Sequence, residues 1–149
     1  MGGEQEECTA MDVAMAVRGL DLMMSQMHLE MSERLGLSAA ELLALAHLSL
    51  YGPLGPTELT HRLHMTTGAM TAMLDRLADR DYVVREPHET DRRRLTVRLT
   101  KSGRDRIFTQ VHGMASGVVA ASERLDPEQR RTVVAYIQEV AGLVSAPAE

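Results

Sequence analysis

Apolar residues recur at intervals of three and four over the first quarter of the chain, as they do on one face of an α-helix. This stripe consists of Val13, Val17, Leu20, Met24, Met27, Met31 and Leu35. Leu22, Met23 and Leu29 lie off the stripe, so the segment has more apolar surface than one contact face requires. The pattern predicts a long helix over residues 11–35 that packs partly on a second chain.

A second helix is predicted to begin after Ser38, because SAAE at residues 38–41 has the spacing of a capping box. In this arrangement the Ser38 hydroxyl accepts from the backbone N–H of Glu41, whose carboxylate accepts from the N–H of Ser38. The helix must end before YGPLGP, because glycine and proline prevent its continuation. GPLGP therefore predicts a turn, and it lacks the pattern of a phosphate-binding loop.

Two short helical patterns follow, TELTHRLH and TTGAMTAMLDRLADRD, and only a few residues around Met65 and Thr66 separate them. Such a tight connection predicts a helix-turn-helix. The second pattern has a buried stripe made of Met70, Met73, Leu74 and Leu77. The residues expected to face outward are Thr67, Gly68, Ala69, Thr71, Ala72 and Arg76.

A β-hairpin is predicted next, from YVVR at residues 82–85 and RLTVRLT at residues 94–100. In the second strand Leu95, Val97 and Leu99 alternate with polar residues, as expected of a strand with one apolar face. The segment between the strands, EPHETDRR, is polar and long enough to form an extended tip. The arginines at 92–94 therefore lie at or beside the end of the hairpin.

Two further helices are predicted after the hairpin. Thr100 is a suitable N-cap for the first, whose apolar face comprises Ile107, Val111, Met114 and Val118. Asp126, Pro127 and Gln129 form a second capping box with proline at the first helical position. The last helix is expected to bury Val133, Val134, Ile137, Val140 and Val144.

Charge is distributed unevenly along the 149 residues, although the net charge is −5. Residues 1–60 carry 2 basic and 9 acidic side chains, whereas residues 61–106 carry 11 basic and 7 acidic ones. A locally basic segment within an acidic chain favours nucleic-acid binding through that segment. A single cysteine, no secretion signal and no apolar run of about 20 residues together predict a cytoplasmic protein with no membrane span.

The segment LDRLADRDYVVREPHETDRRRLTVRLTKSG, residues 74–103, resembles the recognition-helix end, wing and following helix of the MarR family of bacterial transcriptional regulators. The family's Asp-x-Arg matches Asp91 and Arg93, and its Leu-Thr-x-x-Gly matches Leu99, Thr100 and Gly103. The resemblance implies a mainly α, α+β fold: a winged helix-turn-helix with a two-stranded wing and long terminal dimerisation helices. We expect one MarR-like domain over residues 1–149, with a DNA-binding lobe at 38–103 between dimerisation helices at 11–35 and 104–145.

The resemblance further implies a homodimeric repressor that binds a pseudo-palindromic duplex, with half-sites about one helical turn, ~10 base pairs, apart. Arg93 would enter the minor groove and Asp91 would orient it, while Arg92 and Arg94 would meet phosphates. The expected DNA-binding residues are Thr66, Thr67, Gly68, Ala69, Thr71, Ala72, Arg76, Asp91, Arg92, Arg93 and Arg94.

Two positions depart from the family pattern. Asp81 stands where the family usually has glycine before the first wing strand, and aspartate tolerates a left-handed turn less well. Ala72 stands where a long polar side chain is common, and it cannot hydrogen-bond a base. The remaining groove face, with Thr67 and Thr71, suits thymine methyl groups and shape readout better than strong guanine recognition.

Members of the family commonly bind small effectors, and occupancy then shifts the spacing of the two recognition helices. From their places on the first two helices, His28, His47 and Tyr51 are the candidate effector-binding residues. His61 and His64 lack further ligands nearby in the sequence, so no metal site or cofactor is expected.

Three other functions are weighed against the DNA-binding regulator. A winged helix can serve as a protein-docking or dimerisation module without specific DNA binding, because a fold does not fix function. A redox-sensing regulator acting through Cys8 is a second alternative, which the nearby Glu4, Glu6 and Glu7 disfavour because they raise a thiol pKa. An enzyme is not expected, since no nucleophile and base set is present.

Overall fold

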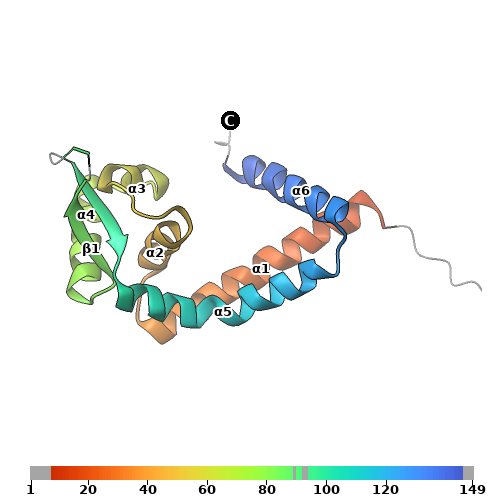
Figure 1. Ribbon diagram of the computed structural model, residues 1–149, viewed down its shortest axis with the longest axis horizontal. Coiled ribbons are helices and arrows are strands. Elements are labelled where there is room, and N and C mark those ends of the chain that lie inside the picture. Colours follow the sequence, from red (N-terminus) through yellow and green to blue (C-terminus); the bar gives the residue numbers. More distant parts are fainter. Residues whose placement is uncertain (1–7, 89, 92–93, 146–149) are drawn as a thin grey trace, which may run out of the picture. The chain divides into compact units, whose positions relative to one another are not determined.

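A computed structural model describes residues 8–88, 90–91 and 94–145, and over these ranges the chain forms six helices and one two-stranded antiparallel sheet (Figure 1). The elements in chain order are α1 (Ala10–Leu35), α2 (Ala39–Tyr51), α3 (Pro56–Arg62), α4 (Thr67–Asp79), β1 (Val83–Pro87), β2 (Leu95–Leu99), α5 (Lys101–Glu123) and α6 (Pro127–Ser145). This is the predicted winged helix-turn-helix between long terminal helices. The chain divides into two compact units, Met1–Ile107 and Phe108–Glu149, with the boundary inside α5, and a single domain over 1–149 stays a prediction.

The predicted helix starts are confirmed by their hydrogen bonds. The Ser38 hydroxyl accepts from the Glu41 N–H at 3.3 Å, and a Glu41 carboxylate oxygen accepts from the Ser38 N–H at 2.8 Å. At α6, Asp126 Oδ1 accepts from the Gln129 N–H at 2.9 Å, and Gln129 Oε1 accepts from the Asp126 N–H at 2.9 Å. Each pair satisfies N–H groups that the helix itself leaves without partners.

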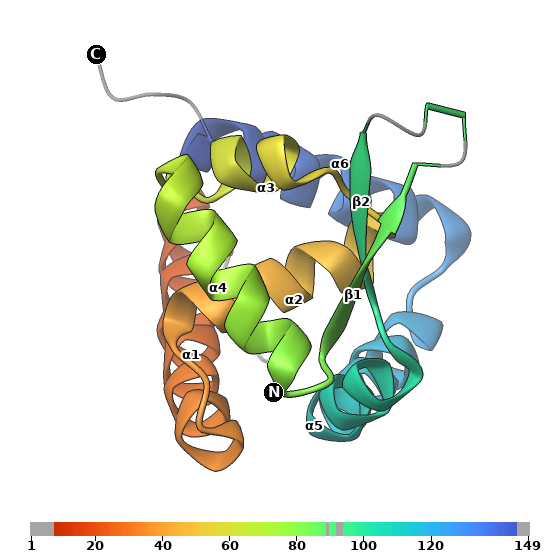
Figure 2. The same cartoon turned by 90° about the vertical axis from the view of Figure 1, so that its left-hand side faces the viewer.

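The core of the first unit forms where α4 packs on α3 and β1, while α2 packs on β2 (Figure 2). The predicted stripe of α4 is buried, and each of its four members is at most 1% exposed. Leu45 of α2, Leu59 of α3 and Val97 of β2 are fully buried as well. The apolar face of α4 is thus held by neighbours on several sides, which leaves its opposite face toward solvent.

The wing pairs Val83 with Leu99 at its base and Pro87 with Leu95 at its far end. Val97 and Leu99 are buried, whereas Leu95 is half exposed because it lies beyond the edge of the core. Leu54, in the segment predicted as a turn, adds a bridge to the wing: its N–H and carbonyl both pair with Val97, at 3.0 and 2.8 Å.

The prediction that α6 buries its apolar face is wrong for the single chain. Val133, Val134 and Ile137 are exposed and Val140 is half-buried. The helical period identified the apolar face correctly, but no described element of the second unit covers it. Among the described residues, no helix is sufficiently long and apolar to cross a membrane.

Candidate nucleic-acid interface

The N-terminal half of α4 presents small and polar side chains to solvent. Thr67, Gly68, Ala69, Thr71 and Ala72 are exposed, as predicted for the outward face, and so is the preceding Thr66. Thr66 caps the helix, because its hydroxyl accepts from the Ala69 N–H at 3.3 Å. The Thr71 hydroxyl donates to the Thr67 carbonyl at 2.9 Å, so its methyl group and the lone pairs of its oxygen remain for a partner. Such a surface allows close approach of a helix backbone to another molecule.

Arg76 is exposed, as predicted, but it also has a partner inside the lobe. Its Nε lies 3.0 Å from Oε1 of Glu41, which is only 5% exposed. Burial raises the pKa of Glu41, yet hydrogen bonds from Ser38 and Arg76 outweigh this and hold the pKa below its ordinary value. Glu41 is therefore a buried carboxylate that ties the start of α2 to α4. DNA contact by Arg76 stays a prediction, in competition with this ion pair.

Arg85 of β1 braces the wing against α4, a contact that the sequence analysis did not identify. Its Nη2 donates to the carbonyl of Thr71 at 3.0 Å, and its Nη1 lies 2.7 Å from a carboxylate oxygen of Asp75. The side chain is about a quarter exposed. The sequence does show a charged residue in the middle of a short apolar strand, which indicates that Arg85 has a partner. It does not show which residue that partner is.

The wing tip is described only in part, since Arg92 and Arg93 lie outside the described residues. The expected minor-groove role of Arg93 and its orientation by Asp91 stay predictions. In the flanking backbone, the Arg94 N–H donates to the Asp91 carbonyl and the His88 N–H donates to the Arg94 carbonyl, both at 2.9 Å. These bonds bring the two ends of the tip together and close the wing.

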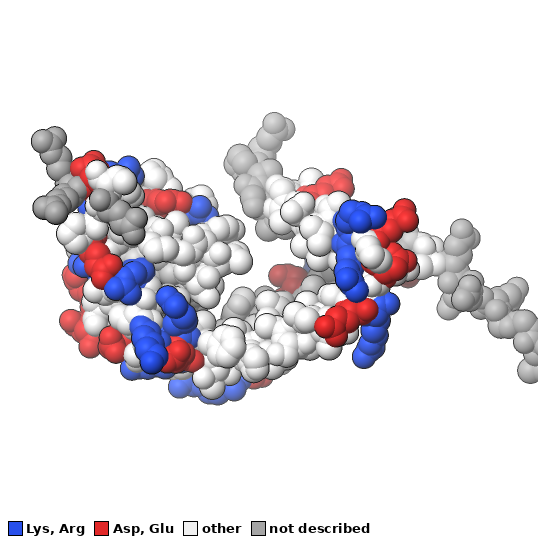
Figure 3. All heavy atoms as spheres, in the orientation of Figure 1, with Lys and Arg blue, Asp and Glu red and all other residues white. Residues whose placement is uncertain are grey.

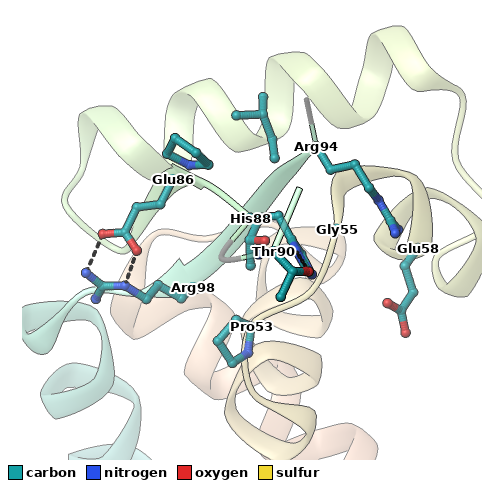
Figure 4. Close-up of a pocket in the computed structure, with 11 residues that line it drawn as sticks. Pro53, Gly55, Glu58, Glu86, His88, Thr90, Arg94 and Arg98 are labelled. Atoms are coloured by element: carbon teal, nitrogen blue, oxygen red, sulfur yellow. Dashed lines mark hydrogen bonds and ion pairs between the residues drawn. The ribbon is translucent and has the colours of Figure 1, made fainter. Parts of the chain in front are cut away.

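A hollow of about 510 Å³ lies between the wing and the segment that precedes α3 (Figure 4). Its lining consists of Pro53, Gly55, Glu58, Glu86, Pro87, His88, Thr90, Arg94, Leu95, Thr96 and Arg98. Arg98 makes a two-pronged ion pair with Glu86, at 2.7 and 2.5 Å, and this hydrogen bonding lowers the pKa of the Glu86 carboxyl. Carboxylates and guanidinium groups share the lining, so the hollow has no single preferred ligand charge.

Ion pairing reduces the positive charge available on the first unit. Among the described residues of this unit five arginines pair with carboxylates: Arg34 with Glu30 on α1 and, within the lobe, Arg62 with Glu58, Arg76 with Glu41, Arg85 with Asp75 and Arg98 with Glu86. Basic and acidic side chains accordingly lie close together on the face seen in Figure 3. The excess of basic residues in the sequence therefore overstates the electrostatic attraction of this lobe for phosphate.

The structure joins two of the three candidate effector-binding residues. The rings of His47 and Tyr51 stack with centroids 5.6 Å apart, and the Arg62 guanidinium lies 4.4 Å from the Tyr51 centroid. Nδ1 of His47 is buried without a hydrogen-bond partner among the described residues. Burial, with a smaller contribution from the charge of Arg62, lowers the pKa of His47. His28 is exposed on the separate helix α1.

Within the described residues, no three His, Cys, Asp or Glu side chains are grouped so as to hold a metal ion. Cys8 is exposed and has a free thiol. The acidic residues expected to disfavour its oxidation lie outside the described ranges.

Comparison with known proteins supports the resemblance. The sequence model of the MarR family matches residues 37–95. The chain is 31% identical over 87 residues to the HTH-type transcriptional repressor YetL of Bacillus subtilis, a match that covers 58% of this chain and 52% of YetL. It is 28% identical over 126 residues to the HTH-type transcriptional repressor MdtR of the same organism, covering 85% of this chain and 81% of MdtR. The chain thus spans about half of YetL and about four fifths of MdtR.

Solved structures share the fold. The transcriptional regulator Tm0710 of Thermotoga maritima superposes with a TM-score of 0.64 at 21% identity, covering 88% of this chain and 92% of Tm0710. A point mutant of MepR from S. aureus, bound to an oligodeoxyribonucleotide, gives a TM-score of 0.58 at 17% identity, covering 89% of this chain and 98% of MepR. YetL, MdtR and Tm0710 are named as regulators and not as enzymes. The family model over residues 37–95, the regulator relatives and the winged-helix architecture all support a winged-helix regulator of the MarR family type.

Proposed function

We propose that the protein is a sequence-specific regulator that binds double-stranded DNA, and that it acts as a ligand-responsive, homodimeric repressor in the cytoplasm. The observation that carries the proposal is the exposed small-residue face of α4, which stands opposite a fully buried stripe on the same helix. A rigidly backed helix with such a face fits the major groove, which admits an α-helix. The wing beside it carries the arginines expected at the minor groove and phosphates.

The groove face favours particular base contacts. Thr67 and Thr71 supply hydroxyl and methyl groups, and Ala69 and Ala72 supply methyl groups, all of which suit the methyl group of thymine. No arginine stands among these four positions to make the two-pronged contact with guanine. We therefore expect a site that is rich in A·T pairs under α4, with wing contacts adding affinity and shape readout.

The proposed partner chain is a second copy of the protein. Large apolar side chains are exposed along α1, α5 and α6: Met11, Val13, Met15, Leu20, Leu22, Met23 and Leu29; Phe108, Met114, Val118 and Val119; Val133, Val134, Tyr136, Ile137 and Leu143. Apolar surface on this scale is characteristic of an obligate interface. The same helices from two chains can cover one another by a two-fold axis, as in most soluble homo-oligomers.

Repression and effector response are the finer parts of the proposal. YetL and MdtR are named as repressors, which favours the same direction of control here. His47 and the exposed Tyr51 on which it stacks offer an aromatic surface to a small ligand. A ligand that prefers one spacing of the two recognition helices would shift their population and alter operator affinity.

The test is selection of bound genomic fragments by the purified protein, followed by titration of the best fragment and a scrambled duplex at two salt concentrations. We expect a palindromic sequence that binds roughly 10³-fold more tightly than scrambled DNA and loses affinity as salt rises. Arg93→Ala should weaken binding and reduce the salt dependence, and Thr71→Val should weaken the selected sequence more than scrambled DNA. Equal, weak binding to all duplexes would exclude the proposal.

A protein-docking module is the second candidate, because the four ion pairs within the lobe reduce its positive charge. A docking module would form the same dimer but show no selected sequence. Measuring the mass of the protein in solution together with the selection distinguishes the two functions, since a dimer is expected from both and an operator from only one.

A further inference from the structure

Arg80 joins the end of the helix that carries the groove face to the end of α1. It is the C-cap of α4, and its guanidinium donates to the Leu35 carbonyl at 2.7 Å through Nη2 and to the Gly36 carbonyl at 2.8 Å through Nη1. Gly36 is the left-handed cap of α1, with φ 60°. One planar guanidinium group thus binds both the last residue of α1, Leu35, and its cap, Gly36. These residues precede Arg80 in the chain by 45 and 44 positions.

The physical chemistry of this contact favours a defined geometry. The last carbonyls of a helix lack partners within it and carry its partial negative charge, so a cation placed there is attracted. Arginine presents its N–H groups in a fixed plane, and two carbonyls held by one guanidinium restrict the rotation of one helix end relative to the other. A lysine would supply the charge but not this restriction.

The same residue is held from the α5 side. The Arg80 carbonyl accepts from Nη1 of Arg106 at 3.1 Å. The guanidinium groups of Arg80 and Arg106 lie 5.4 and 4.8 Å from the ring centroid of Tyr82, which is 2% exposed. A desolvated aromatic ring attracts both cations. The end of α4, the end of α1 and the second turn of α5 are therefore fastened around one short segment, residues 80–82.

We propose that Arg80 is a positioning residue, which sets the direction of α4 relative to α1 and the start of α5. The inference about DNA rests on the proposed function. If α1 and α5 form the dimer interface, the contacts of residues 80–82 with these helices, here called the joint, fix the separation of the two α4 helices in the dimer. Arg80 then determines which half-site spacing the dimer accepts, without touching DNA. Sequence readout by the groove face and spacing readout by the joint are separate properties of the lobe.

The first experiment measures the joint directly and needs neither DNA nor a dimer. In a Cys8→Ser background, spin labels at Asp21→Cys on α1 and Ala72→Cys on α4 report the distance between these helices within one chain. Dilution with excess unlabelled protein removes signals between chains. We expect Arg80→Gln to broaden the distance distribution. The matched control is Arg34→Gln, an exposed arginine in the last turn of α1 that pairs with Glu30 four residues away, and it should leave the width unchanged. An unchanged width in Arg80→Gln overturns the proposal.

The second experiment compares operators whose half-sites are one base pair closer or further apart than the selected spacing. We expect Arg80→Gln to reduce the preference for the selected spacing by about tenfold, a typical size for coupling between two sites. The salt slope of binding should stay the same; a slope reduced by about one would identify Arg80 as a phosphate contact and overturn the positioning role. If Arg80→Gln keeps the wild-type preference for half-site spacing, the positioning role is overturned as well, whatever the thermal stability of the variant. If the wild type selects no operator, the proposed function fails, and the spin-label experiment still decides the role of Arg80.

Discussion

The α-carbon of Gly103 lies so close to the backbone of Tyr82 that a Cβ atom added to Gly103 would be 2.2 Å from the Tyr82 carbonyl oxygen. The neighbouring bonds explain this approach. The Gly103 N–H donates to the Thr100 hydroxyl at 2.8 Å, and the Thr100 N–H donates to the Tyr82 carbonyl at 3.0 Å. The first turn of α5 is thereby seated on the start of the wing. The glycine of the Leu-Thr-x-x-Gly motif is required by this contact and not by its backbone angles.

We expect Gly103→Ala to destabilise the fold by about 3 kcal/mol, because a methyl group cannot be placed without moving backbone. Gly113→Ala in the same helix is the control, since a Cβ there meets no atom within 4 Å. That control should be neutral or stabilising by up to about 1 kcal/mol, as alanine is the better helix former. Urea unfolding of both variants measures the difference, and equal effects would mean that α5 is not seated as described.

Asp81 adopts the left-handed conformation that its family position suggested, with φ 56°. Glycine accepts this conformation without steric cost, although it loses more chain entropy on folding. We expect Asp81→Gly to raise the unfolding free energy by about 0.5 kcal/mol. Asp79→Gly, in the last turn of α4, should instead lower it by about 0.5–1 kcal/mol. Thermal unfolding of the two variants is the measurement. A loss of stability in Asp81→Gly would show that the left-handed conformation of Asp81 is not strained.

The Glu41 carboxylate should make stability depend on acid pH. Its pKa lies below the ordinary value of 4.5, so the folded state holds it ionised more strongly than the unfolded chain does. Its contribution is therefore complete above that ordinary value and is lost as the pH falls through the lowered folded pKa. We expect Glu41→Gln to cost about 1–2 kcal/mol at pH 7 and progressively less toward pH 3.

Glu30→Gln is the control for this pH dependence, because Glu30 belongs to an exposed ion pair with Arg34. Such pairs contribute little, so the control should change stability by less than about 0.5 kcal/mol. Denaturant unfolding at several pH values tests both variants. A cost of Glu41→Gln that stayed constant down to pH 3 would show that the charge of the carboxylate is not what stabilises the contact.

Local sequence patterns predicted the elements whose stabilising contacts are three or four residues apart. The capping boxes at Ser38 and Asp126 and the buried stripe of α4 belong to this class, because their partners recur at helical spacing. The wing was predicted from its alternation, but β1 extends to Pro87, beyond the predicted strand. Strand ends depend on pairing with the opposite strand, which alternation within one strand does not specify.

Contacts between distant residues could not be predicted in this way. Arg85 and Thr71 are 14 residues apart, and Arg80 and Leu35 are 45 apart. No period connects such pairs, and an arginine on a polar surface has the same local pattern whether or not it braces a helix. Burial on α6 was predicted wrongly for a related reason: an apolar face shows that a partner is favourable, but not that the same chain supplies it.

His47 should lower stability in mildly acidic solution. Because burial and Arg62 lower its folded pKa, the unfolded chain takes up a proton at a pH where the folded state does not. Stability therefore falls as the pH drops below about 6.5, the ordinary histidine value. His47→Phe keeps a ring against Tyr51 and removes the titrating group, so its stability relative to the wild type should rise from pH 7.5 to pH 5.5. A constant difference over this range, measured by urea unfolding, would contradict the assignment.

Arg85 should control how the wing and α4 cooperate on DNA. Its guanidinium joins β1 to the Thr71 carbonyl and to Asp75, so Arg85→Gln frees the wing from the helix without removing a side chain expected at the phosphates. If the wing and α4 must contact one duplex in a fixed orientation, the added mobility of the wing lowers affinity only for DNA that both elements contact. We expect specific binding to weaken by about tenfold, a typical coupling between two sites, with little change for scrambled DNA.

Arg98→Gln provides the matched control, because Arg98 pairs with Glu86 inside the wing. Its specific affinity should stay within about twofold of the wild type, as expected for an exposed pair. Titration at two salt concentrations separates a brace from a phosphate contact. If Arg85→Gln reduced the salt slope by about one and weakened all duplexes equally, Arg85 would be a phosphate ligand, and the wing would be positioned by its hairpin and by the bridge to Leu54 alone.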